Sequence, residues 1–347
     1  MKKSLFKKLA VPITVMSLAI SIIGCSAEES STSSKGAGKN KVSGEKIILR
    51  LSEAQVDDYP DSRAEKKFAK IVEEKSDGRI KVDVYTAGQL GDEKTTIEQT
   101  QVGVIDMGRA NAGPLTQFAE KFGVFSFPFL FDSRDHMWKA IDGGLGDELF
   151  KNLEEKGDLV GLAFYDAGAR NFYSKDPISK LKDVKGKKIR VMQNDILIDA
   201  FKELGVSPTP LSASEVYSAL QMGVIDGGEN NVSTYVADGH FEIAKNFTES
   251  EHLRIPGVLF MSKKTWDKLS SEDQKIIKEA AKESEKFQQD AYDKYSDEAM
   301  KKVEEKGNKV IQLSKEDREA FRDKVKPVYD KYKDQFGDLF KTIDDAK

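Results

Sequence analysis

Apolar residues recur with two different periods near the start of the chain. Residues 46–52 and 80–85 have the apolar content and alternation of strands, whereas residues 61–75 place their apolar residues on one helical stripe. A glycine-broken loop then leads into a predicted helix over 94–102. This strand, helix, strand, helix order with short connections predicts an α/β fold with a mainly parallel sheet covered on both faces. Such folds place their sites at the strand ends.

One internal repeat indicates how many such units there are. Residues 101–108 (QVGVIDMG) recur as residues 221–228 (QMGVIDGG), and Asn111 and Asn231 follow at the same offset. Each copy is typical of a helix end, a glycine cap, a short buried strand and a loop that can approach a ligand closely. We therefore expect two similar domains whose strand ends face a shared cleft. The alternative is a coincidence between two ordinary helix-to-strand turns.

The second half of the chain predicts a long helix. Residues 270–306 contain neither proline nor glycine, and Gly307 ends the run. At about 1.5 Å per residue such a helix is roughly 55 Å long, so it should cross both domains. A further helix over 315–336 should be broken near Pro327. Six phenylalanines between residues 118 and 131 indicate an interdomain core rather than a cofactor pocket.

The stretch 186–194 (GKKIRVMQN) contains the first candidate binding residue. As a strand it would place Ile189 and Val191 on one face and Arg190 and Met192 on the other. The nearest acidic residues in sequence lie seven positions before Arg190 and five positions after it. An arginine held on a short strand without a nearby acid can bind a planar anion through two parallel N–H donors. The alternative is an exposed arginine on an edge strand.

A second arginine is expected near the first. Arg170 follows a predicted buried strand over 159–165 and lies on its strand-end loop, not far in sequence from Arg190. Two arginines delivered by adjacent strands would form an anion clamp, at about 1.5 to 3 kcal/mol for each charge-assisted hydrogen bond. We expect removal of either arginine to leave folding nearly unchanged, because it relieves repulsion in an empty anion site.

Catalytic and cofactor motifs are missing from the sequence. There is no phosphate-binding loop, dinucleotide fingerprint, nucleophile elbow or metal-ligand spacing. The three histidines are scattered, and His136 and His240 are best interpreted as satisfied packing or helix-end residues. We therefore expect no enzyme activity, no cofactor and no metal. A secreted hydrolase or transferase stays open as a distant alternative, which turnover of a bound solute would reveal.

The amino terminus predicts export. Four lysines precede an apolar run over 9–23, which is typical of a secretory signal peptide ending at residue 24. Cys25 is the only cysteine, and the residues before it resemble a lipobox, so we expect a lipidated cysteine that anchors the protein to the outer face of the membrane. The alternative is an unmodified cysteine. Residues 26–41 are almost free of apolar side chains and indicate a flexible tether.

The overall charge excludes one class of partner. Four of the 55 basic residues and none of the 59 acidic ones lie in the leader, so the remainder carries a formal charge of −8. An acidic body is a poor partner for nucleic acid or for an anionic membrane surface. Any anion must therefore be held by a few local groups.

Seven ordered motifs carry a family resemblance. They are QLGDE (89–93), GVID (103–106), FPFLF (127–131), GAR (168–170), GKKIRV (186–191), EVYSALQ (215–221) and IDGGENN (225–231). Together they resemble the DctP family, the solute-binding proteins of TRAP (tripartite ATP-independent periplasmic) transporters. The resemblance implies a two-domain periplasmic-binding-protein-like fold with a long helix spanning both domains. The implied domains are 45–167 with 256–295, and 168–255 with 296–347, after a leader (1–24) and a lipidated tether (25–44).

The resemblance also implies a function and a set of site residues. Family members are not enzymes: they close over an organic acid and deliver it to the membrane subunits of a permease. The resemblance assigns the solute carboxylate to Arg190, with Arg170, Asn230 and Met192 beside it, and the solute hydroxyls to Glu93, Arg109 and Asn111. The motif combination looks most like the branch that takes sugar acids such as glucuronate or galacturonate. Four-carbon dicarboxylates are the runner-up solute, and a surface receptor without transport is a further alternative. Ala213 departs from the aromatic residue that many members carry there.

Overall fold

The computed structural model describes residues 45–347. The predicted signal peptide, the lipidation of Cys25 and the tether lie outside these residues. A membrane-spanning helix would need a long apolar run, and none of the helices described here has one.

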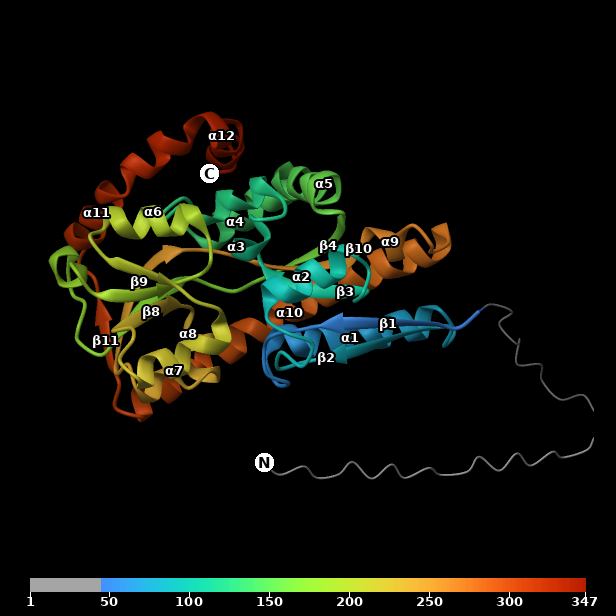
Figure 1. Ribbon diagram of the computed structural model, residues 1–347, viewed down its shortest axis with the longest axis horizontal. Helices are drawn as coiled ribbons and strands as arrows, with labels where there is room; N and C mark the ends of the chain where they lie inside the picture. The colour runs from blue at the N-terminus through green and yellow to red at the C-terminus, as the bar shows by residue number, and fades with distance from the viewer. Residues whose placement is uncertain (1–44) are drawn as a thin grey trace, which may run out of the picture. The chain divides into compact units, whose positions relative to one another are not determined.

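The strands form two mixed sheets (Figure 1). The order in the first sheet is β2 (Ile80–Tyr85), β1 (Ile47–Ser52), β3 (Met107–Asn111), β10 (Gly257–Ser262), β4 (Leu159–Tyr165). The order in the second sheet is β11 (Lys309–Gln312), β9 (Asn246–Leu253), β5 (Arg170–Ser174), β8 (Gly227–Asn230), β6 (Lys188–Val191), β7 (Ser207–Pro210). We call the parts of the chain around these sheets the first lobe and the second lobe.

The prediction of mainly parallel sheets is confirmed, with one exception in each sheet. β1 pairs in parallel with β2 and β3, and β6 pairs in parallel with β7 and β8, but each sheet also contains one antiparallel strand. That strand is β10 in the first sheet and β5 in the second, and each comes directly after the chain crosses from the other sheet. A chain that enters a sheet where the parallel strands end must run back against them, which explains the reversed direction.

Helices cover these sheets. They are α1 (Pro60–Lys75), α2 (Glu93–Gln101), α3 (Ala112–Leu115), α4 (Arg134–Ala140), α5 (Gly146–Gly157), α6 (Asp195–Glu203), α7 (Val216–Gln221), α8 (Val232–Ala237), α9 (Lys263–Trp266), α10 (Ser271–Glu305), α11 (Lys315–Lys324) and α12 (Lys326–Asp344). Shorter helical turns are η1 (Glu120–Ser126), η2 (Ile141–Leu145), η3 (Leu181–Val184), η4 (Ala213–Glu215) and η5 (His240–Glu242).

The predicted long helix is confirmed as α10. The Ser270 hydroxyl accepts a hydrogen bond from the Asp273 amide and caps its first turn, and the helix ends before Gly307, which has a positive φ of 71°. α10 packs against α1 and β4 of the first lobe and against α8 and β11 of the second, and Figure 1 shows it running along both sheets. α10 therefore packs on both lobes and is also one of the segments through which the chain passes between them.

The last predicted helix is broken where proline requires it. α11 ends at Lys324, and α12 starts at Lys326, after the single intervening residue Val325, with Pro327 in its first turn. α12 continues to Asp344, beyond the predicted end at residue 336, because Phe336, Leu339 and Ile343 form a buried stripe at helical spacing.

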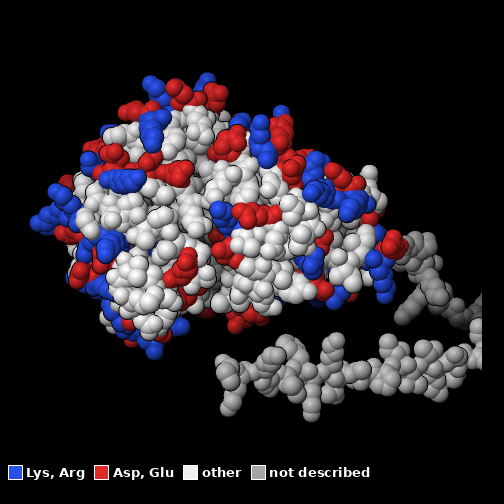
Figure 2. Space-filling model, viewed as in Figure 1, with Lys and Arg blue, Asp and Glu red and all other residues white. Residues whose placement is uncertain are grey.

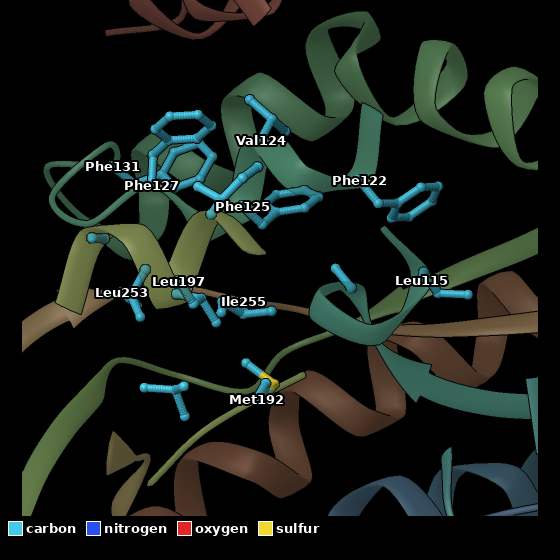
Figure 3. Packing of buried hydrophobic residues seen from close by; sticks show 14 of the residues in the cluster. Leu115, Phe122, Val124, Phe125, Phe127, Phe131, Met192, Leu197, Leu253 and Ile255 are labelled. Atoms are coloured by element: carbon cyan, nitrogen blue, oxygen red, sulfur yellow. The ribbon is translucent and has the colours of Figure 1, made fainter. Parts of the chain in front are cut away.

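The aromatic segment forms the core between the lobes, as predicted. Its phenylalanines share one buried cluster with Phe164 of β4 and Val258 of β10 in the first sheet, and with Phe172 of β5 and Ile189 of β6 in the second. Figure 3 shows several of these phenylalanines on one side of the cluster and the cleft residue Met192 on the other. Burial of this single cluster holds the rear of the two lobes together.

The two copies of the repeat fold alike. Gly103 and Gly223 turn the chain with φ of 79° and 72°, values that glycine adopts at little cost. The Asp106 carboxylate then accepts a hydrogen bond from the backbone amide of Arg50 on β1 at 2.9 Å, and Asp226 accepts one from Lys188 on β6 at 2.8 Å. Each aspartate thereby fixes the neighbouring parallel strand, so the two copies perform the same local task in the two sheets.

Candidate functional site

A cleft of about 440 Å³ lies between the two sheets. Its walls are the loops that follow β1, β2 and β3 in the first lobe and β6, β7 and β8 in the second, which is the edge where α/β sheets place their ligands. All seven residues assigned from the sequence line this cleft: Glu93, Arg109, Asn111, Arg170, Arg190, Met192 and Asn230. Basic and acidic side chains are interspersed over the visible surface (Figure 2), so selectivity for an anion must come from local groups.

Arg190 is a buried arginine without an acidic partner. It lies on β6, an inner strand, and is only 5% exposed, so the edge-strand alternative is wrong. Its Nε and Nη2 donate to the Leu211 carbonyl at 3.0 and 2.8 Å, and no described carboxylate lies within 4.0 Å of it. Burial lowers the pKa of the guanidinium, which shows how poorly its charge is solvated. Nη1 and the second Nη2 proton remain available to a ligand.

Arg170 differs from the prediction in two ways. β5 and β6 are not adjacent, because β8 lies between them. Arg170 is also already paired: its Nε and Nη2 donate to the two carboxylate oxygens of Glu229 at 2.6 and 2.9 Å, and Nη2 donates also to the Glu229 carbonyl at 2.8 Å. Arg170 is 2% exposed and Glu229 is fully buried. This pairing argues against the expectation that removing Arg170 would leave folding unchanged.

Asn230 and Met192 lie beside the two arginines. The Asn230 Oδ1 accepts from Arg170 Nη1 at 2.8 Å and from the backbone amide of Asn231 at 2.9 Å. Both oxygen lone pairs are therefore occupied, and the amide Nδ2 remains for a ligand. Met192 is 3% exposed and packs so closely on Gly113 of the first lobe that a Cβ there would lie 3.1 Å from its Sδ and Cε. The methionine thereby joins the lobes at the rear of the cleft.

In the first lobe, acids surround Arg109. Its guanidinium pairs with Asp61, with Glu53 at 3.8 Å and with Glu93 at 3.5 Å, and it is 2% exposed. Burial tends to lower the pKa of Arg109, but these acids outweigh it and raise the pKa well above its ordinary value. Arg109 therefore orients the cleft acids more than it offers free charge to a solute.

Glu93 receives three donors on one oxygen. Its Oε1 accepts from the Asn111 amide and from Asn111 Nδ2, both at 2.8 Å, as well as from Arg109. Burial raises the pKa of the Glu93 carboxyl. The side chain is 14% exposed, so its second oxygen can accept a hydrogen bond from a ligand hydroxyl.

Tyr59, Asp238 and His240 are among the cleft residues that were not identified from the sequence. Tyr59, before α1, lies against the second lobe, where its hydroxyl is 3.0 Å from Thr234 Oγ1 and donates to Asn231 Oδ1 at 3.5 Å. Asp238 and His240 follow α8 and line the cleft. Tyr59 lies on the loop after β1, where the strand-end rule indicates a site, but Asp238 and His240 come only after the next helix, which that rule does not reach.

The interpretation of the histidines is right for His136 and only partly right for His240, which does begin η5 and stack on Tyr173 but is not satisfied. His136 is satisfied, since Nδ1 accepts from the Asp132 amide at 3.1 Å and Nε2 lies 2.8 Å from the Ile343 carbonyl. His240 is 1% exposed and neither ring nitrogen has a partner among the described residues. Burial lowers the pKa of His240 to about 3, so the ring is neutral at physiological pH.

Two α/β lobes whose strand ends face one cleft define a two-lobed binding protein for a small molecule. The chain belongs to the bacterial extracellular solute-binding proteins, family 7 (DctP), whose family model matches residues 51–335.

Relatives and solved structures agree with this membership. The chain is 36% identical to a solute-binding protein of Chromohalobacter salexigens over 83% of its own length and 85% of the relative's. It is 27% identical to the C4-dicarboxylate-binding protein DctB of Bacillus subtilis over 84% of both chains. A TRAP periplasmic solute-binding protein of Bradyrhizobium sp. BTAi1, solved in complex with galacturonate, superposes with a TM-score of 0.83 at 40% identity, covering 86% of this chain and 99% of that one. A Pseudomonas putida F1 protein with bound D-glucuronate gives 0.83 at 36% identity, covering 86% and 97%.

Proposed function

We propose that this protein is the extracytoplasmic solute-binding protein of a TRAP transporter, that it binds a hexuronate such as galacturonate or glucuronate, and that it delivers the hexuronate to the membrane permease. The observation that carries the proposal is Arg190, a buried cation in the cleft that lacks an acidic partner among residues 45–347. Structural neighbours at 35 to 40% identity hold galacturonate or glucuronate, which supports the choice of solute. The role is binding and release, without catalysis or a cofactor.

The solute carboxylate would lie against the Nη1 and Nη2 edge of Arg190. The Leu211 carbonyl occupies the other edge of the guanidinium and fixes its plane, so two parallel donors are presented to one carboxylate. Arg170 and the Asn230 amide flank this position from β5 and β8. Across the cleft, the open oxygen of Glu93, which Arg109 orients, and the Asn111 side chain, which Glu93 holds, would receive the sugar hydroxyls.

Four-carbon dicarboxylates are the second candidate, because the Bacillus subtilis relative is named for binding them. Calorimetric titration of the purified protein with galacturonate, glucuronate, succinate and malate separates the two. We expect binding of at least one hexuronate and much weaker binding of the dicarboxylates. Tight binding of succinate or malate without binding of either hexuronate would overturn the proposal.

We also propose that the lobes correspond to residues 45–167 with 256–295 and to residues 168–255 with 296–347, and that they close over the solute as rigid bodies. This division is supported by the two places where the chain passes between sheets, from β4 to β5 and from β9 to β10, with α10 as the third connection. Small-angle scattering with and without galacturonate should show compaction on binding.

Finally, we propose export by the leader and lipid anchoring through Cys25. The support is the sequence alone: a cationic start, a short apolar run and the single cysteine at the lipobox position. Cys25→Ala should release the protein into the medium or leave the leader uncleaved, with solute affinity intact. Unchanged membrane association of the variant would contradict the anchor.

A further inference from the structure

The arginines of the cleft do not offer equal charge to a solute. Arg109 pairs with Asp61, Glu53 and Glu93, and Arg170 pairs with Glu229. Within residues 45–347, Arg190 is thus the one cleft arginine without an ion pair. Lys94, which also lines the cleft, is exposed to water and its charge is screened. The buried part of the cleft therefore offers a solute carboxylate one guanidinium that is not engaged in an ion pair.

The cleft also contains a carboxylate without a counterion. Asp238 follows the last turn of α8, lines the cleft and is partly buried. Its carboxylate makes no ion pair and no hydrogen bond with any side chain in the described part of the chain. Burial raises the pKa of Asp238 to about 6, although the positive charge of Arg190 acts to lower it. Asp238 and Arg190 are therefore close enough to interact electrostatically. Asp238 is therefore mainly ionised at neutral pH.

We propose that Asp238 is a specificity residue that selects a polyhydroxylated acid with a single carboxylate and disfavours acids with two. This inference rests on the proposed function and refines the class of solute. An ionised carboxylate only accepts hydrogen bonds, so it matches sugar hydroxyls, which donate them. A second solute carboxylate would lie close to Asp238 and to the open oxygen of Glu93 in a poorly solvated cleft, and no second free arginine would be there to pair with it. This contact between like charges weakens the binding of an acid with two carboxylates.

The titration of Asp238 itself makes this selection dependent on pH. The titratable and charged groups around Asp238 are Tyr173 on β5, Arg190 on β6, Tyr217 on α7, His240 on η5, Tyr295 on α10, and Tyr59 and Glu93 in the first lobe. Burial raises the pKa of Tyr59, Tyr173 and Tyr295 and lowers that of His240 to about 3, so these groups stay neutral between pH 5 and pH 8. Protonation of Asp238 near pH 6 should therefore relax the exclusion of dianions.

The test compares galacturonate with galactarate, the six-carbon acid that carries a carboxylate at both ends. Affinities of both are measured by calorimetry at pH 7.5 and pH 5.5 for the wild type, Asp238→Asn and Glu242→Gln. Glu242 lies nearby on η5 but is exposed and does not line the cleft, so its variant removes one negative charge outside the cleft, and the amide can still accept the 3.5 Å hydrogen bond from Tyr217. Melting temperatures without solute check that the variants fold.

For the wild type we expect galacturonate to bind at least about tenfold more tightly than galactarate at pH 7.5, and this ratio to fall at pH 5.5. Asp238→Asn should reduce the ratio at pH 7.5 about fivefold or more and remove most of its pH dependence, whereas Glu242→Gln should change neither. An unchanged ratio in Asp238→Asn, or galactarate binding still undetectable while galacturonate binds, would overturn the inference. Failure of the wild type to bind any hexuronate would instead overturn the proposed function.

Discussion

The ion pair between Arg170 and Glu229 gives a prediction about stability that is independent of the solute. Glu229→Gln keeps the shape of the side chain but removes the negative charge beside an arginine that is 2% exposed. The bonds from Arg170 to the Glu229 carbonyl and to Asn230 Oδ1, both 2.8 Å, survive. His252 cannot replace the lost charge: its Nε2 lies 3.9 Å from Glu229, but burial lowers its pKa far below the ordinary value, so the ring is neutral.

Breaking a buried pair by removing one partner costs about 3 to 5 kcal/mol, because the remaining charge stays desolvated. We expect Glu229→Gln to lie near the lower end of this range, since the bonds to the backbone carbonyl and to Asn230 persist and the amide oxygen of the introduced glutamine can still accept one more. Urea unfolding followed by circular dichroism measures the change. The control is Glu74→Gln, which breaks an exposed pair with Lys70 at 3.7 Å and should cost about 0.5 kcal/mol or less. A loss below about 1 kcal/mol for Glu229→Gln would refute the claim that this pair holds Arg170.

Two further predictions concern the first lobe and the contact between lobes. Burial raises the pKa of Glu65 well above 4.5, so the folded protein keeps a proton that the unfolded chain releases, and the contribution of Glu65 to stability falls as the pH rises. Glu65→Gln should therefore stabilise the protein relative to wild type by an amount that grows from pH 5 to pH 8, by up to about 1.4 kcal/mol per pH unit in urea unfolding. A stability difference from wild type that is independent of pH would contradict this. Tyr59→Phe removes the hydroxyl that contacts Thr234 of the other lobe, so it should weaken galacturonate binding about three- to tenfold in calorimetry with little change in melting temperature. Unchanged affinity would show that this contact between the lobes does not favour the closed form.

Much of the fold was predictable because local signals and global structure agree. The strand over 80–85, the start of α10 after Ser270 and the break before Pro327 follow from period, capping and proline chemistry, which depend only on nearby residues. The repeat predicted two equivalent strand ends, because its glycine and aspartate perform the same local task in each copy.

The wrong predictions concern pairings that the sequence does not specify. The order of β5, β8 and β6 depends on how the chain crosses between sheets, so the adjacency of Arg170 and Arg190 could not be inferred from their spacing. The partner of Arg170 is 59 residues away in the chain, within a motif where Asn230 was assigned but Glu229 was not. His240 was misjudged for the same reason, because the absence of a partner for a buried ring is a property of the packed structure.

The central claim is that a buried arginine on β6 holds the carboxylate of a sugar acid. The most direct test is a calorimetric titration of the wild type, Arg190→Lys and Arg190→Ala with galacturonate and with galactose, which is neutral, alongside melting temperatures without solute. The wild type should bind galacturonate and not galactose. Arg190→Lys should lose the bidentate geometry, and Arg190→Ala should lose about 3 kcal/mol or more, a hundredfold or greater loss of affinity. Affinity of Arg190→Ala for galacturonate within about twofold of wild type would contradict the account.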